Sequence, residues 1–200
     1  MKNKKAIGLL FAANIISGFA QGISMIAIPW YFADILAMGG TYAKAYAILT
    51  FLSLFWGLYS GTLIDRYSRK KMFLYSNLTC AFIIGSIAVY GMIFGQTPWI
   101  LVLAVFGTTM FHYNVHYPNL YAFGQEITEP KNYAKLNAYI EIQGQSTSIF
   151  AGAFAAILLT GTQNGILNLL GFKIQMPFNI QAWHIHEIFL MDAFTYVLAF

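Results

Sequence analysis

Charged residues are scarce in this chain. Only 9% of its 200 residues are Asp, Glu, Lys or Arg, whereas 58% are hydrophobic and 18% are aromatic. A soluble domain of this composition would expose large apolar patches to water. The composition therefore excludes a soluble enzyme or soluble binding module, and we expect an integral protein of the lipid bilayer.

Other features are also missing. Cys80 is the single cysteine, so the chain can form no intramolecular disulfide. It lacks a G-x-x-x-x-G-K motif, which argues against ATP hydrolysis by this chain, and we expect no cofactor. The net charge of +4 comes from short basic clusters beside apolar runs and not from a basic stripe, so we expect no nucleic-acid partner.

Long apolar runs fill most of the chain. A membrane-spanning helix needs about 20 largely apolar residues. Six runs predict an all-α membrane protein with helices near 6–33, 42–64, 71–94, 98–121, 136–160 and 185–200. The last run would rise about 24 Å, less than the roughly 30 Å hydrocarbon core, so we expect the sixth helix to continue past residue 200.

The basic residues predict an orientation. Nine of the eleven Lys and Arg residues lie before the first run, in the 65–71 turn, or between the fourth and fifth runs. The opposite side has only Lys44 and Lys173. Because positive charge collects on the cytoplasmic side, we expect a cytoplasmic N-terminus in a plasma (inner) membrane. The opposite stretch 161–184 mixes apolar residues with glycines, which favours an interfacial segment on the bilayer.

The most distinctive pattern closes the second predicted helix. It reads Gly57-x-x-x-Gly61-x-x-x-Asp65-Arg66-x-x-Arg69-Lys70. This spacing resembles the signature loop of the major facilitator superfamily of secondary transporters, and residues 116–159 look more loosely like its macrolide-efflux and siderophore-export branch. The resemblance implies the N-terminal six-helix half of a twelve-helix fold, with a second six-helix half in the full-length chain.

The resemblance also implies roles for the signature loop. Asp65 would stabilise the closed cytoplasmic gate by meeting the positive end of a partner helix. The glycines would let that helix approach closely, and the bases would pair with cytoplasmic carboxylates, although they could instead serve only to set topology. The residues concerned are Gly57, Gly61, Asp65, Arg66, Arg69 and Lys70.

Polar faces on the first and fifth predicted helices are candidates for a substrate cavity. In the first, Asn14 and Gln21 belong to a small, polar face that either lines a cavity or allows close helix packing. In the fifth, Glu141 and Gln145 share a face, and Asp192 lies in the sixth. Glu141 or Asp192 is a candidate proton carrier, because burial disfavours a charged carboxylate; the alternative is a hydrogen-bonded structural acid.

His112 and His116 lie one turn apart on the fourth predicted helix. Two such histidines can share a metal ion, but no third ligand is adjacent, so a polar, aromatic cavity wall is favoured and no metal site is predicted. We therefore expect a secondary transporter that moves a small amphipathic organic solute by alternating access, with proton-coupled export favoured. The alternatives are a metal-dependent intramembrane enzyme using these histidines and a six-helix assembly or dimerising protein.

Overall fold

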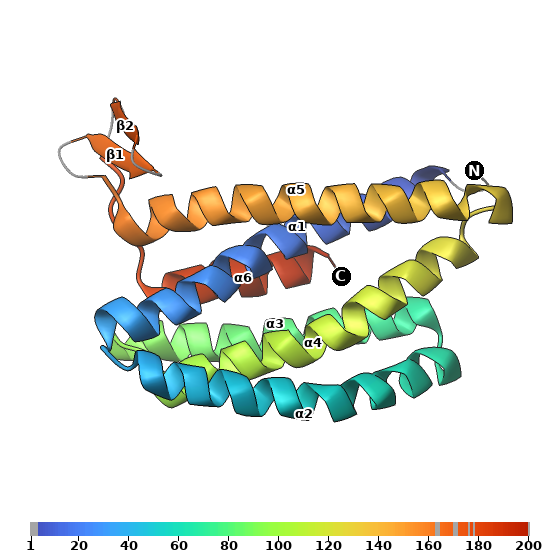
Figure 1. The fold of residues 1–200 in the computed structure, drawn as a ribbon, viewed down its shortest axis with the longest axis horizontal. Helices are drawn as coiled ribbons and strands as arrows, with labels where there is room; N and C mark the ends of the chain where they lie inside the picture. The colour runs from blue at the N-terminus through green and yellow to red at the C-terminus, as the bar shows by residue number, and fades with distance from the viewer. Residues whose placement is uncertain (1–3, 163–164, 170–171, 176, 178, 200) are drawn as a thin grey trace.

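The structure is a computed structural model that describes residues 4–162, 165–169, 172–175, 177 and 179–199. The predictions that concern Lys2 and the course of the sixth helix at residue 200 lie outside these residues. Six helices form one bundle (Figure 1): α1 (Lys4–Trp30), α2 (Gly39–Arg66), α3 (Arg69–Phe94), α4 (Trp99–Glu126), α5 (Tyr133–Thr160) and α6 (Ile185–Leu198).

The six predicted helices are all present, and most are longer than the apolar runs that predicted them. A π-helical turn, Tyr31–Ile35, extends α1, and a 3-10 turn, Pro130–Asn132, precedes α5. By length and composition, four segments of the described chain can span a membrane: Lys5–Ile35, Gly39–Arg66, Arg69–Phe94 and Pro130–Thr160. The chain is thus a helical protein of the membrane type.

The remaining two helices differ from these four. α4 is long enough to span, but its second half contains a polar run that includes two histidines and two asparagines. α6 has only 14 described residues. Their crossing of the membrane stays a prediction.

The stretch 161–184 contains an element that the sequence analysis did not predict. Strands β1 (Ile166–Leu169) and β2 (Phe172–Gln175) pair as an antiparallel hairpin. It projects beyond the end of α5, on the side of the bundle away from the α2–α3 turn (Figure 1). Whether this segment lies on a bilayer, as its composition suggests, stays a prediction.

Each helix of the bundle packs against at least one other. α1 packs on α5, α2 and α3 both pack on α4, and α6 packs against both α3 and α1. In Figure 1, α5 and α2 lie at opposite edges of the bundle. A core of buried apolar side chains joins α1, α3, α4, α5 and α6, whereas α2 exposes a row of large apolar residues such as Leu54, Phe55 and Leu58. This outer surface suits contact with lipid.

The bases of the two turns gather at one end of the bundle. The α2–α3 turn and the α4–α5 turn lie at the end where α1 begins (Figure 1), and they contain or adjoin Arg66, Arg69, Lys70, Lys71, Lys131 and Lys135. The uneven distribution of charge that the sequence predicted is therefore present in three dimensions. The side of the membrane that this end faces remains a prediction.

Candidate functional site

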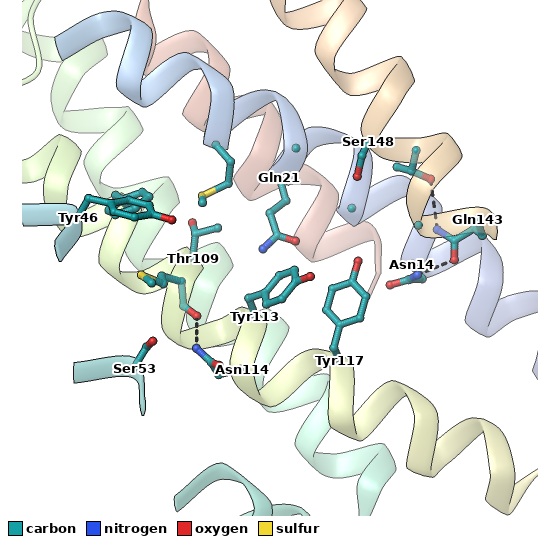
Figure 2. Close-up of a pocket in the computed structure, with 17 residues that line it drawn as sticks. Asn14, Gln21, Tyr46, Ser53, Thr109, Tyr113, Asn114, Tyr117, Gln143 and Ser148 are labelled. Carbon is teal, nitrogen blue, oxygen red and sulfur yellow. Dashed lines mark hydrogen bonds between the residues drawn. The ribbon is translucent and has the colours of Figure 1, made fainter. Parts of the chain in front are cut away.

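A cavity of about 410 Å³ lies between the α1–α5 pair and the α2–α4 pair. Its polar lining, much of it labelled in Figure 2, consists of Asn14, Gln21, Tyr46, Ser53, Thr109, Tyr113, Asn114, Tyr117, Gln143, Thr147 and Ser148. Among the described residues, none of those that line it is charged. We call this the central cavity, and its volume falls in the range of small-molecule sites.

Three helices meet at Asn14. The Asn14 Nδ2 donates to the Gln143 Oε1 of α5 at 2.6 Å, and the Asn14 Oδ1 lies 2.8 Å from the His116 Nε2 of α4. Gln143 in turn donates to the Thr147 Oγ1 at 3.3 Å. Because Asn14 is 4% exposed, these bonds stabilise one arrangement of α1, α4 and α5 at the cavity wall.

Small residues set the spacing of α1 and α5. A Cβ atom placed on Gly22 would lie 2.8 Å from the Cβ of Ala151, and one on Gly18 would lie 3.8 Å from the Thr147 Cγ2. The backbones can approach this closely because Gly22 has no side chain. The small, polar face of α1 therefore has both functions that the sequence left open, since it packs closely and also lines the cavity.

Aromatic rings form the wall contributed by α4. Tyr113 and Tyr117 lie with their ring centroids 4.4 Å apart, and in Figure 2 both extend toward the same space as Gln21. At the other end of the cavity, the ring centroid of Tyr46 of α2 lies 5.8 Å from that of Phe106. The central cavity thus combines aromatic faces with amide and hydroxyl groups, which suits an amphipathic and uncharged molecule.

Of the residues of α1 and α5 that were predicted as cavity or proton-coupling residues, only those of α1 line the central cavity. Asn14 and Gln21 line the central cavity, as expected. Glu141 and Gln145 are exposed and do not line it, and Glu141 accepts a hydrogen bond from the Tyr121 hydroxyl. Their proposed part in proton coupling or solute binding therefore has no support from position.

The two histidines of α4 are buried beside the cavity and do not line it. His112 and His116 have ring centroids 5.1 Å apart, and each directs its Nε2 to an asparagine oxygen: His112 to Asn77 at 3.2 Å and His116 to Asn14 at 2.8 Å. In the described part of the chain, no group of three His, Cys, Asp or Glu side chains is placed to bind a metal ion.

A second cavity, of about 570 Å³, lies among α2, α3 and α4. Its lining is mostly apolar and includes His112 and Cys80. Because few polar groups converge there, the central cavity is the better candidate for a solute site.

The turn between α2 and α3, whose sequence resembles the signature loop, is very short. α2 ends at Arg66, Tyr67 and Ser68 connect the helices, and α3 begins at Arg69. The Arg69 guanidinium contacts the Glu126 carboxylate at 3.5 Å and the Ala122 carbonyl oxygen at 3.3 Å. One of the three predicted carboxylate pairings of this loop is therefore present.

The other residues of the loop are more open. Asp65, Arg66 and Lys70 are exposed, and no ion pair is found for them within the described chain. A Cβ on Gly57 or Gly61 would meet no atom within 4 Å. Both glycines thus leave room for a further helix, and the gating role stays a prediction.

Sequence reasoning missed several residues of the cavity wall. Gln143 and Thr147 are four residues apart and form one hydrogen-bonded ridge on α5, yet the more polar face containing Glu141 and Gln145 was preferred. A polar, aromatic cavity wall was predicted around His112 and His116, but Tyr113 and Tyr117, which line the cavity, were not singled out. The spacing of four residues in both pairs was the signal that could have identified them.

Similarity to known proteins gives no further guide. No protein-family profile, curated protein or solved structure matches this chain.

Proposed function

We propose that this chain is a six-helix bundle of a secondary transporter of the major facilitator type, and that it binds a small, uncharged, amphipathic organic solute in the central cavity. One observation supports this most directly: a cavity whose lining combines apolar surface with uncharged polar groups lies in a helical bundle whose outer surface is apolar. A polar lining at this depth is costly in a membrane protein unless it contacts protein, water or a ligand.

The chemistry of the lining indicates the class of solute. Asn14, Gln21 and Gln143 offer amide donors and acceptors, and Tyr113 and Tyr117 offer aromatic faces. A charged solute would enter without a counter-charge and would lose its hydration, which is unfavourable. A neutral molecule with one apolar and one hydrogen-bonding part fits best.

The mechanism that we propose is alternating access. The turn between α2 and α3, with Asp65 exposed and Gly57 and Gly61 open, would form the cytoplasmic gate together with a second six-helix bundle. The basic end of the bundle would face the cytoplasm, in agreement with the rule for positive charge. Export is the direction that the sequence resemblance favours.

A labelling experiment tests this proposal without knowledge of the solute. Ser148 is exposed at the cavity wall, so Ser148→Cys introduces a thiol there, while the native Cys80 is buried. The protein is reconstituted in vesicles and treated with a membrane-impermeant maleimide on one side at a time. We expect labelling from both sides, because alternating access opens the cavity to each in turn.

The matched control is Leu58→Cys, on the exposed apolar surface of α2. We expect little labelling there from either side, since a thiol in contact with lipid does not ionise readily. Labelling of Ser148→Cys from one side only would contradict a transporter and would favour a static cavity.

The alternative of a metal-dependent intramembrane enzyme has less support. It requires a third ligand beside His112 and His116, and the described residues provide none. Both histidines also direct one ring nitrogen to an asparagine, an arrangement suited to buried polar packing.

A further inference from the structure

The most unusual group outside the central cavity is the carboxyl of Asp192. Its side chain is fully buried on α6, and among the described residues neither carboxyl oxygen has a hydrogen-bond partner of ordinary geometry. An ionised carboxylate in such a place lacks compensation for its lost hydration. The site therefore favours the neutral, protonated form of the carboxyl.

The groups that face Asp192 are polar and uncharged. Ser24 of α1 interacts with its carboxyl, Cys80 of α3 lies within electrostatic range, and Tyr196 lies one turn along α6. Beyond this contact of Ser24 with Asp192, no hydrogen-bond partner is found among the described residues for the buried hydroxyls of Ser24 and Tyr196. Across the described chain, no Lys or Arg forms an ion pair with Asp192. A proton is thus the simplest positive charge that can neutralise it.

A line of polar side chains leads from Asp192 toward the central cavity. The Tyr196 ring packs edge-on against His112 with 5.2 Å between centroids, and the His112 ring lies 5.1 Å from that of His116. His116 then bonds to Asn14, which lines the cavity. The line therefore joins α6 through α4 to α1.

Both histidines have a free basic nitrogen. The Asn14 amide nitrogen donates to Gln143, so its oxygen faces His116 and the His116 Nε2 must carry the hydrogen. The His112 Nε2 lies 3.2 Å from the Asn77 oxygen and carries the hydrogen in this orientation of the amide, although the Asn77 Nδ2 has no partner among the described residues to fix that orientation. In the neutral rings each Nδ1 is therefore an acceptor, and both Nδ1 atoms are buried without a donor. The cluster contains an acid without an acceptor and two bases without a donor.

We propose that Asp192 is a proton-binding site and that Tyr196, His112 and His116 form a relay between it and the central cavity. A proton leaves the Asp192 carboxyl and binds a histidine Nδ1, so that a carboxylate and an imidazolium replace two neutral groups and the net charge is unchanged. Side-chain rotation or bridging water spans the distances between the rings. An imidazolium at position 116 strengthens its hydrogen bond to Asn14 and so links proton binding to the cavity wall.

Infrared titration tests the proton site directly. The purified protein, in a maltoside detergent that has no ester carbonyl, is scanned for the carbonyl stretch of a protonated carboxyl between pH 5 and 9. We expect a band at neutral pH that Asp192→Asn lacks and that Glu141→Gln, at an exposed acid, retains. Absence of the band from the wild type, or its persistence in Asp192→Asn, would overturn the proposal.

Two additions make the assignment specific. If Asp192→Asn does not fold, Asp192→Glu replaces it and should shift the frequency of the band without removing it; an unshifted band would also overturn the proposal. Loss of the band at constant pH on exchange of choline chloride for NaCl would assign the site to a metal cation and reject the proton.

The relay has its own readout. A histidine that shares the proton stabilises the protonated form of the cluster, so His116→Gln should move the disappearance of the band to lower pH. His184→Gln, at an exposed histidine, should leave it unchanged. Equal titration of the His116 variant and the wild type would rule out the relay.

The link between this proton site and transport rests on the proposed function, and the two proposals can fail independently of each other. The ratio of Ser148→Cys labelling from the two sides, in which the pH dependence of the thiol itself cancels, should change with pH in the otherwise native protein and become independent of pH when Asp192→Asn is added. One-sided labelling with an intact infrared band would reject the transporter and keep the proton site. Two-sided labelling without the infrared band would keep the transporter and reject the proton site.

Discussion

Replacing Gly22 with alanine should weaken the contact between α1 and α5. The added Cβ would lie 2.8 Å from the Cβ of Ala151, whereas apolar carbons pack at about 3.5–4.0 Å. The helices would have to separate by roughly 1 Å, and overpacking of this kind costs about 1–3 kcal/mol. For a chain of this size, the apparent Tm should fall by about 2–4 °C per kcal/mol.

Cys80 provides the assay. It is the single cysteine and is buried, so a fluorogenic maleimide reacts with it only as the protein unfolds on heating. Gly57→Ala is the matched control, because a Cβ there meets no atom within 4 Å, and it should stay within about 0.5 kcal/mol of the wild type.

A second substitution tests the cause of the loss. Ala151→Gly removes the opposing methyl group, so the double variant should be more stable than the sum of the two single changes predicts, by about 1 kcal/mol or more. If Gly22→Ala matches Gly57→Ala in stability, or if the two changes at the contact are additive, the close approach of α1 and α5 is not as described.

Three further predictions concern the end of the bundle that contains the basic turns. Asp65→Asn should alter stability by less than about 0.5 kcal/mol, since Asp65 is exposed, but should change the ratio of labelling from the two sides if it stabilises the gate; an unchanged ratio would count against that role. Arg69→Ala and Glu126→Gln should show a coupling of at most about 1 kcal/mol in a double-variant cycle of thermal unfolding, because their contact is partly exposed, and a coupling of several kcal/mol would contradict the geometry. The Lys131 ammonium lowers the pKa of the Glu129 carboxyl through a hydrogen bond and through its charge. The small stabilisation from this ion pair is therefore present above the ordinary pKa of a glutamate and is lost as the pH falls through the lowered pKa. Lys131→Ala should raise the pKa of Glu129 measured by NMR.

The sequence predicted the helices because apolarity and length are local properties. It placed their ends less well. α2 begins at Gly39, before the predicted residue 42, and α4 continues to Glu126, beyond the predicted residue 121. Polar residues continue a helix outside the hydrocarbon layer, where apolarity no longer marks its course. The hairpin was missed because its two strands have only four residues each.

The site was predicted only in part, for a different reason. Periodicity shows which residues share a face but not the direction in which that face points. On α5 the close contact of Ala151 with Gly22 turns Gln143 and Thr147 toward the cavity and leaves Glu141 outside. Such a rotation depends on two helices distant in sequence. The partners of Asp192 were unpredictable likewise, since Ser24 of α1 and Cys80 of α3 come close to it only in the folded bundle.

The two-residue connection between α2 and α3 constrains how the protein enters its membrane. Four basic residues lie at or beside this connection, and moving them across the hydrocarbon layer would be costly. The two helices are therefore too closely joined to be inserted one after the other with independent orientations. We expect them to enter as a helical hairpin, with the basic connection left on the side from which they insert.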